Sequence, residues 1–538
     1  MKRIGGLTVV ALVAIVWGPA RAEDWPQWRG PQGDGVAPPG PVLADSWPAD
    51  GPKKLWESED VIIAQQLNGG FGGVSVAGGR AYLYAHWKSR PPIATRTVSA
   101  DVLKRLGWWP GELPADLAGA MEQARLSEER AKLKPKELKP WLDKWVAEHL
   151  KDADTPKVRP LATYVRQRLS QGAGAIALDV LAKLVEIKDR EFPDTDSLDK
   201  WLAGSSLAGD LKARVLRVVP TTGPETATDT FFCLDADTGK TIWKREFPNQ
   251  APFGNGVSTT VCIAGDRLLG AGGKVVYCLD VKDGSAVWQV PVAGGGISSS
   301  PVAVGGKMVI LAGRLTAYRI ADGTVAWTQP KLTGSNPSPV LWSSGGKTYL
   351  ICNANAGLAC VDPADGQILW KVPGGGSGSP VVNNDVAVLF GPNTNTGLVA
   401  YKITPEKAEK LWSLPYADRG TSAILFQGYM YSVGGLKDAK ALCVAVSDGK
   451  PAWEQAKGFE KAEVNSPILA DGKIIMFMGL TTHELVMFKA SPEKFEALAR
   501  AKVETSKPPS CNCTSPSIVD GRLFLRLNER VVCYDLRK

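Results

Sequence analysis

One recurring phrase restricts what this chain can fold into. Its best-preserved copy is FFCLDADTGKTIW (231–243): an apolar strand, a turn with Thr-Gly, and a second strand that ends in tryptophan. Five related phrases follow at intervals of 39 to 45 residues, and the closing tryptophans are Trp243, Trp288, Trp327, Trp370, Trp412 and Trp453. A repeat of this length, made of strands and turns with no helix inside it, predicts the four-stranded blades of a β-propeller.

The turn and the tryptophan of each phrase serve the blade itself. An Asp-Gly or Thr-Gly pair supplies a positive φ at a tight hairpin, and the Asp side chain can bond the turn backbone. The indole covers a large apolar area and can still place its N–H on a partner. We therefore expect these tryptophans, together with Trp56, to join neighbouring blades rather than to carry chemistry.

The phrase resembles the repeat of the quinoprotein-type β-propeller family. That repeat reads A-x-D-x-x-T-G-x-x-x-W, and CLDADTGKTIW (233–243) matches it best. The family includes dehydrogenases that use pyrroloquinoline quinone (PQQ) and non-enzymatic propellers such as the outer-membrane-protein assembly propeller. The resemblance covers about 350 residues and implies the fold, because the repeat residues serve the blade and not a ligand.

The two ends of the repeat region complete each other. KKLWES (53–58) is a tryptophan-bearing strand with no partner before it, and residues 515–536 hold three strands with none after them. Their pairing would leave no open edge in the ring. Counting first strands gives eight blades, of which the unit ending near Leu498 has lost its tryptophan. We predict an all-β, eight-bladed propeller over 53–87 and 229–538, closed by its N- and C-terminal segments.

Residues 88–228 interrupt the first blade. Apolar residues at three- and four-residue spacing predict helices over 112–133, 136–150, 161–171 and 175–190. In propellers the loop between the second and third strands lies on the same face as the loops that enter the innermost strands. We expect a helical insertion beside or over the channel mouth, either as a solvated decoration or as a lid or partner-docking module.

The beginning of the chain has the features of a secretory signal. A charged start precedes an apolar core over 7–17, and an A-x-A cleavage site follows at 20–22. We predict a cleaved signal peptide over 1–22, no stable membrane span, and a periplasmic or secreted protein. A Pro- and Gly-rich arm follows over 23–52, in which Arg29 is either a ligand contact or a structural bond. The formal net charge of +8 is modest and gives no sign of nucleic acid binding.

Chemistry in such a fold is expected at the channel mouth, on the loops that enter the innermost strands. These loops consist of Gly, Ser and Asn almost throughout: 68–75, 253–260, 294–301, 334–339, 374–380, 418–422, 463–467 and 511–516. Small residues let the backbones crowd the axis; the alternative is a polar site that offers amides and hydroxyls. The ionisable exceptions are Asp418, Arg419 and Glu463.

The resemblance also implies what a PQQ enzyme would need: carboxylate and Asn ligands for Ca²⁺, an Asp as general base, and an Arg over the quinone. The candidate catalytic residues are then Asp418 and Glu463. The candidate cofactor contacts are Arg419, Asn465, Asn336, Asn255 and Ser379. The chain has neither the adjacent cysteines that many such enzymes carry nor a C-x-x-C-H haem motif, and its three histidines match no metal spacing.

The nine cysteines fall into three groups. Five share a repeat position that other repeats fill with Ala, which indicates small buried strand sites: Cys233, Cys278, Cys360, Cys443 and Cys533. Cys262 and Cys352 lie on predicted strands and are also expected to be buried. Cys511 and Cys513 lie on a channel-face loop, where they pair, bind a soft metal or act as structural or free thiols.

Two functions remain. We favour a non-catalytic binding or assembly scaffold without a cofactor, whose partner is another extracytoplasmic protein held through the channel face or the helical insertion. A mouth poor in carboxylates and the missing cysteine pair and haem motif favour it. The alternative, implied by the resemblance, is a PQQ- and Ca²⁺-dependent dehydrogenase that oxidises an alcohol or a sugar.

Overall fold

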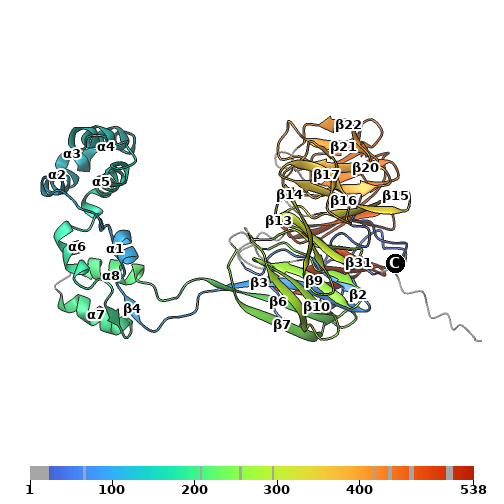
Figure 1. Ribbon diagram of the computed structural model, residues 1–538, viewed down its shortest axis with the longest axis horizontal. Coiled ribbons are helices and arrows are strands. Elements are labelled where there is room, and N and C mark those ends of the chain that lie inside the picture. Colours follow the sequence, from blue (N-terminus) through green and yellow to red (C-terminus); the bar gives the residue numbers. More distant parts are fainter. Residues whose placement is uncertain are drawn as a thin grey trace, which may run out of the picture. The chain divides into compact units, whose positions relative to one another are not determined.

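The computed structural model describes residues 24–64, 68–205, 209–253, 257–293, 296–416, 418, 420–433, 439–459, 466–503 and 513–538. The chain divides into two compact units (Figure 1). One is built of strands; it ends at Ser89 and resumes at Thr226. The other is helical and runs over Arg90–Glu225.

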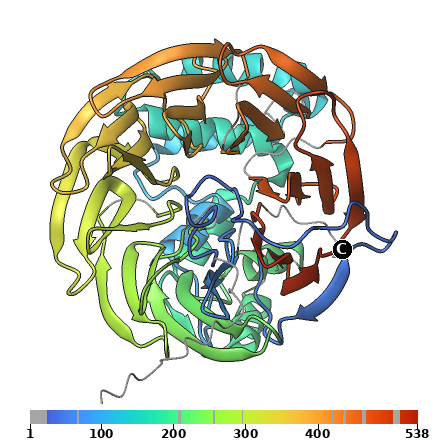
Figure 2. The same cartoon turned by 90° about the vertical axis from the view of Figure 1, so that its right-hand side faces the viewer.

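The β unit consists mainly of four-stranded antiparallel sheets that lie side by side around a ring (Figure 2). We number the sheets in chain order. Sheet 1 has the order β2(Ser75–Ala77)-β3(Arg80–Ser89)-β6(Thr226–Asp235)-β7(Thr241–Gln250), and sheet 2 has the order β8(Cys262–Ala264)-β9(Arg267–Gly272)-β10(Val275–Asp280)-β11(Ala286–Pro291). Sheet 4 has the order β15(Val340–Ser344)-β16(Lys347–Ala354)-β17(Gly357–Val361)-β18(Ile368–Val372), and sheet 5 has the order β19(Val381–Asn383)-β20(Val386–Phe390)-β21(Leu398–Ile403)-β22(Ala408–Leu414). Sheet 6 has the order β23(Ile424–Phe426)-β24(Tyr429–Val433)-β25(Ala441–Ala445)-β26(Pro451–Gln455), and sheet 7 has the order β27(Ile468–Ala470)-β28(Lys473–Met478)-β29(Glu484–Lys489)-β30(Ala497–Lys502).

Sheets 3 and 8 depart from this pattern. Sheet 3 has the order β12(Val302–Val304)-β13(Lys307–Arg319)-β14(Val325–Gly334), because β13 continues through Gly313 and pairs with β12 by its first half and with β14 by its second half. Sheet 8 has the order β31(Ser517–Val519)-β32(Arg522–Arg526)-β33(Val531–Asp535)-β1(Lys53–Glu57). Its outermost strand therefore comes from the N-terminal half-repeat, with Trp56 opposite Cys533. The arrangement is that of a β-propeller.

The closing tryptophans bond one sheet to the next. The indoles are buried, except that of Trp453, which is partly buried, and each Nε1 donates to a backbone carbonyl of the following repeat. The bonds are Trp56–Ala236 (3.0 Å), Trp243–Val281 (3.0 Å), Trp288–Ile320 (2.8 Å), Trp327–Pro363 (3.0 Å), Trp370–Thr404 (2.7 Å), Trp412–Val446 (2.8 Å) and Trp453–Ser491 (2.8 Å). The bond from Trp56 joins sheet 8 to sheet 1.

The turn glycine has a second purpose besides its positive φ. Gly239 has φ 73°, and a Cβ built there would lie 2.4 Å from the ring of Trp56. The same contact recurs between Gly366 and Trp327, at 2.5 Å. Any larger residue would push the indole of the preceding sheet away, so the turn and the tryptophan of neighbouring repeats depend on each other.

The slot shared by Ala and Cys lies directly opposite the closing tryptophan. Cys278 faces Trp288, and Ala317 faces Trp327. A small residue opposite a large one lets the two strands pack without a clash. In sheet 7 the large and the small residue change places. Met487 takes the position of the small residue, and Ala499 opposite it takes the position of the tryptophan.

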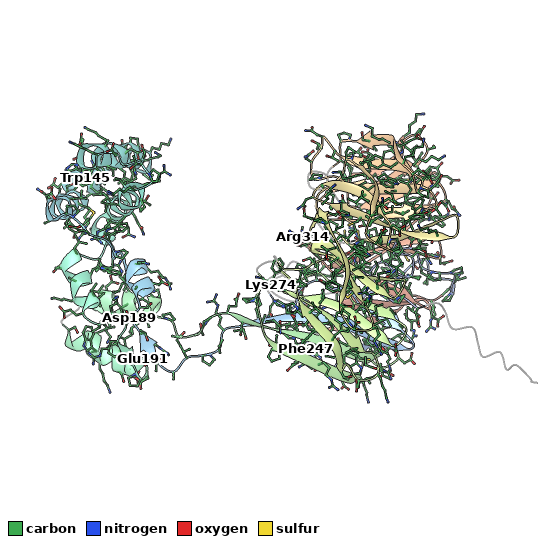
Figure 3. All side chains as sticks on the ribbon, in the orientation of Figure 1. Trp145, Asp189, Glu191, Phe247, Lys274 and Arg314 are labelled. Atoms are coloured by element: carbon green, nitrogen blue, oxygen red, sulfur yellow. The ribbon has the colours of Figure 1, made fainter. Side chains whose placement is uncertain are left out.

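The helical unit contains two apolar cores. The described helices are α1(Ala100–Leu106), α2(Ala115–Arg125), α3(Glu128–Lys132), α4(Pro135–His149), α5(Arg159–Gln171), η1(Gly172–Gly174), α6(Leu178–Val185), α7(Thr195–Gly204) and α8(Gly209–Val218), with a short pair of strands, β4(Arg96–Thr97) and β5(Glu191–Phe192). Residues of α1, α6, α7 and α8 form one core, and residues of α2, α4 and α5 form the other. Trp145 belongs to the second core and stacks on His149, with ring centroids 3.9 Å apart (Figure 3).

Buried ion pairs stabilise the helical unit. Glu122 accepts from Arg125 at 2.6 Å and from Arg168 at 2.5 Å, and Arg168 also donates to the carbonyl of Ile176 at 2.7 Å. Hydrogen bonds from the two arginines help lower the pKa of Glu122, although burial alone would raise it. Within the described residues, no helix is both long and apolar enough to cross a membrane. The placement of this unit beside the channel mouth stays a prediction.

Candidate functional site

The loops at the centre of the β unit carry a ring of hydroxyl groups. In most of these loops a Ser precedes the Pro that enters the innermost strand, as in Ser300-Pro301. Its oxygen accepts the backbone N–H of the equivalent residue in the preceding sheet. The bonds are Gly73–Thr260 (2.9 Å), Thr260–Ser300 (3.0 Å), Ser300–Ser338 (2.9 Å), Ser338–Ser379 (2.8 Å), Ser422–Ser466 (3.1 Å) and Ser466–Ser515 (3.2 Å).

Two further bonds continue this set, which we call the hydroxyl ring. The Ser422 hydroxyl donates to the carbonyl of Ser379 at 3.1 Å and so joins sheet 6 to sheet 5. The Ser517 hydroxyl donates to the carbonyl of Val74 at 2.5 Å and joins sheet 8 to sheet 1. Ser338 and Ser379 are no more than 5% exposed. These hydroxyls therefore hold the sheets together, and they are not presented to a ligand.

One bond of the ring makes a direct test. We expect Ser338→Ala to lower the free energy of unfolding by about 1 kcal/mol, because the buried N–H of Ser300 loses its acceptor. Ser343→Ala, at an exposed position of β15, is the matched control and should change it by less than about 0.5 kcal/mol. Urea unfolding of the full chain measures both. Equal effects of the two variants would contradict a bonding role for the Ser338 hydroxyl.

The arm that precedes β1 lies along the innermost strands. Trp25, 1% exposed, exchanges two backbone bonds of 2.8 Å with Val76 of β2, and the carbonyl of Pro26 accepts from Ile263 of β8 at 2.7 Å. Farther along, Val36 forms a parallel bridge to Leu469 of β27. In Figure 2 the dark blue trace of the arm crosses the middle of the ring. The chain itself thus occupies the inner surface of the β unit.

Arg29 fastens the arm to two sheets. It is 2% exposed, and its guanidinium donates to the carbonyls of Asp34 (2.6 Å), Ala423 (2.5 Å), Pro467 (3.1 Å) and Ser422 (3.4 Å). Burial lowers the pKa of Arg29 to about 10, and the nearby Asp34 partly opposes that shift. Of the two roles expected for Arg29, a ligand contact or a structural bond, the structure shows the structural bond.

Three of the candidate site residues lie in the described part of the chain, on successive loops that hydrogen bonds connect. Asp418 is 1% exposed, and its Oδ1 accepts the backbone N–H groups of Gly420 and Thr421 at 2.8 Å each. Asn336 is exposed and donates to the hydroxyl of Ser377 at 3.1 Å. Ser379 belongs to the hydroxyl ring. The remaining candidates lie outside the described residues: Asn255, Arg419, Glu463 and Asn465, with Cys511.

The described part of the channel does not fit PQQ with Ca²⁺. The cation needs six to eight oxygen ligands, whereas the described carboxylate, Asp418, accepts bonds from its own loop. The hydroxyls bond neighbouring sheets, and the arm lies along the innermost strands of sheets 1, 2 and 7. Among the described residues there is also no group of three or more His, Cys, Asp and Glu side chains that could hold a metal ion.

The repeat cysteines are buried and unreactive by environment. Cys233 and Cys360 are fully buried, and burial raises the pKa of each thiol to about 12. Cys262 and Cys352 have the same environment, with pKa values raised to about 12 by burial. Since the thiolate is the reactive form, none of these four is suited to nucleophilic or metal chemistry.

Sequence reasoning missed a buried polar cluster between sheets 1 and 2. Asp229, fully buried, accepts from Tyr84 (2.5 Å), Tyr277 (2.7 Å) and Nδ1 of His86 (2.6 Å). Nε2 of His86 accepts from the backbone N–H of Phe253 at 3.3 Å. An Asp–His pair of this kind orients a general base in hydrolases. Here the second ring nitrogen is already bonded, so the cluster is structural.

Arg526 was also missed. It is fully buried at the end of β32, and its guanidinium donates to five backbone carbonyls: Ile62 (3.4 Å), Ile63 (2.5 Å), Gly69 (3.1 Å), Gly72 (3.2 Å) and Tyr84 (3.0 Å). Burial lowers its pKa to about 9. The available signal was an arginine inside an otherwise apolar strand, RLFLRL, where the alternation predicts a buried position.

Comparison with known proteins points to one family. A family profile described as "Outer membrane protein assembly factor BamB" matches residues 228–455. BamB of Yersinia pestis is 29% identical over 149 residues, which cover 26% of this chain and 37% of that protein. BamB of Moranella endobia is 26% identical over 273 residues, covering 45% and 66%. BamB of Shewanella oneidensis is 36% identical over 107 residues, covering 18% and 26%.

The chain therefore spans between about a quarter and two thirds of the length of these relatives. Among solved structures, BamB of Moraxella catarrhalis aligns with a TM-score of 0.44 at 14% identity, over 55% of this chain and 86% of that one. The repeat phrases, the four-stranded sheets around a ring and the profile match together make this chain similar to the PQQ-like β-propeller family.

Proposed function

We propose that the protein is a non-catalytic binding or assembly scaffold outside the cytoplasm. In this proposal the eight sheets are the blades of one propeller that β1 and β33 close, and residues 88–228 are a helical insertion in the first blade. The insertion or the channel face holds another extracytoplasmic protein. The predicted signal peptide over 1–22, which lies outside the described residues, accounts for export.

One observation carries the proposal: the chain uses the inner surface of its own ring. The arm bonds to sheets 1, 2, 6 and 7, and the hydroxyl ring bonds sheet to sheet. A quinone enzyme needs that surface for its cofactor and substrate. The names of the relatives, outer membrane protein assembly factors, support a role in assembly.

Titration with PQQ distinguishes the scaffold from the alternative, a PQQ-dependent dehydrogenase. We expect no saturable change in tryptophan fluorescence when the full chain is titrated with PQQ and Ca²⁺ up to about 1 mM, and no reduction of dye with alcohols or sugars. Saturable binding at micromolar PQQ that is lost in Arg419→Ala or Glu463→Gln would make the protein an oxidoreductase and end the scaffold proposal.

The docking face can be tested because the insertion has a natural excision point. β3 and β6 pair in register as far as Ser89 opposite Thr226, so a two-residue Asn-Gly turn can join them as a hairpin. In cross-linking to extracytoplasmic proteins, with partners identified by mass spectrometry, the full chain and the excised chain are compared. Loss of the partner on excision assigns docking to the insertion, and retention assigns it to the channel face. Absence of any specific partner for the full chain would count against a scaffold.

A further inference from the structure

A cavity lies at the junction of sheets 7 and 8. It has a volume of about 660 Å³, and its walls come from the arm between Ala44 and Lys54, the end of β30, and the end of β33 with Arg537. This size suits a small-molecule ligand, since such sites typically enclose about 300–1,000 Å³. Neither the hydroxyl ring nor the helical unit contributes to it.

The cavity has a structural origin. Among the described sheets, only sheet 7 lacks a closing tryptophan, because Ala499 holds that position on β30. The arm partly fills the space: Trp47, Leu498 and Ala499 all pack against the same apolar core, and a Cβ on Gly51 would lie 3.2 Å from that of Ala501. The cavity is the space that the arm leaves unfilled.

The walls are held by backbone bonds. The N–H of Ala44 donates to the carbonyl of Leu536 at 2.8 Å, and the N–H of Gly51 closes a turn on the carbonyl of Pro48 at 2.9 Å. Lys53 pairs with Asp535 in the register of β1 and β33. The backbone of the walls is therefore fixed before a ligand arrives, and only the exposed side chains become ordered on binding.

The lining is cationic. Its charged residues are the cations Lys53, Lys54, Lys502 and Arg537 and the carboxylates Asp50 and Asp535. Asp535 already accepts two bonds from Arg537, at 2.8 and 2.9 Å, and Lys54 pairs with Glu57 at 2.9 Å. Lys53 and Lys502 make no ion pair with any described residue, and both are exposed. Lys53 and Lys502 are thus the two cations of the lining that an anion would meet, and Lys53 also acts on the carboxylate of Asp535 opposite it.

We propose that this cavity binds a small polyanion. Two or more phosphate or carboxylate groups of the ligand would meet Lys53 and Lys502, and its apolar part would lie along Trp47 and Pro48. An aromatic and proline wall beside paired cations suits a ligand of mixed character, because the wall buries carbon while the ammonium groups bind charge.

The test is isothermal titration calorimetry of the full chain at low ionic strength. Tripolyphosphate and citrate are the two probes, and the one that binds more tightly shows whether the site selects phosphate or carboxylate. We expect one site per chain, and weaker binding as salt is added. The double variant Lys53→Gln/Lys502→Gln should weaken binding by about tenfold, because each exposed ion pair contributes modestly and two are lost.

A matched pair of lysines supplies the control. Lys371 on β18 and Lys410 on β22 are exposed on outermost strands elsewhere and make no ion pair with described residues. Lys371→Gln/Lys410→Gln changes the net charge equally and should leave the affinity unchanged. Equal weakening in both double variants, an unchanged affinity in Lys53→Gln/Lys502→Gln, or no binding of either probe up to about 10 mM would overturn the proposal.

Discussion

Arg526→Met is expected to lower the free energy of unfolding by about 4 kcal/mol, the largest effect of any substitution considered for this protein. Methionine fills much of the same space but donates no hydrogen bond. The carbonyls of Ile62, Gly69 and Tyr84, with two others, would lose their common donor inside a fully buried site. Each unsatisfied buried carbonyl costs about 1–3 kcal/mol, and relaxation of the loop recovers part of the total.

Urea unfolding of the full chain measures this loss. Arg319→Met is the matched control, because Arg319 also stands at the end of a strand, β13, but is exposed. It should shift the free energy of unfolding by less than about 0.5 kcal/mol. A loss below about 1 kcal/mol in Arg526→Met would show that the five carbonyls find other donors at little cost.

Arg29→Met is expected to lower the free energy of unfolding by about 3 kcal/mol and to loosen the arm. The guanidinium is the bond between the arm and sheets 6 and 7, through Ala423 and Pro467. Arg29→Lys should lose less, because an ammonium can still donate to some of these carbonyls although it lacks the planar fork.

Hydrogen exchange separates local loosening from general destabilisation. The N–H of Ala37 donates to Leu469 at 2.7 Å, and its protection should fall more in Arg29→Met than that of amides in β16, which pair with β15 and β17 instead of the arm. Arg314→Met, at an exposed position on β13 (Figure 3), should change neither. Equal loss of protection in the arm and in β16 would contradict a local clamp.

These two arginines have a common consequence for function. Each ties segments distant in the chain by hydrogen bonds to backbone carbonyls. The arm and the two arginines fasten distant segments to the sheets, and the proposed scaffold needs this rigidity whether the insertion or the channel face holds its partner.

Much of the fold was predictable because its causes are local. The 39- to 45-residue interval, the turn glycine and the closing tryptophan belong to one or two adjacent repeats, so the pattern shows on the chain. The two half-repeats at 53–58 and 515–536 predicted the pairing of β1 with β33. The small residue opposite each tryptophan is visible in the same way, as Cys or Ala at one repeat position.

Short helices and merged strands were harder to predict. α1 has seven residues, and α7 and α8 have ten each, too few turns for the apolar period to stand out. The count of strands by repeat also left open that β13 runs through Gly313 as one strand, paired with β12 at one end and β14 at the other. In both cases packing decided what the local pattern left open.

The use of the polar residues was decided by tertiary structure alone. The sequence by itself determined that the central loops would be rich in Ser and Gly, and it left open whether those hydroxyls would meet a ligand or the chain. The partner of the Ser338 and Ser379 hydroxyls is a backbone N–H about 40 residues away, in the neighbouring sheet. Arg526 reaches carbonyls more than 440 residues away in sequence. Repeats can be recognised in the sequence because each recurs at a short interval. The partner of a buried polar group depends instead on which sheets the closed ring brings together.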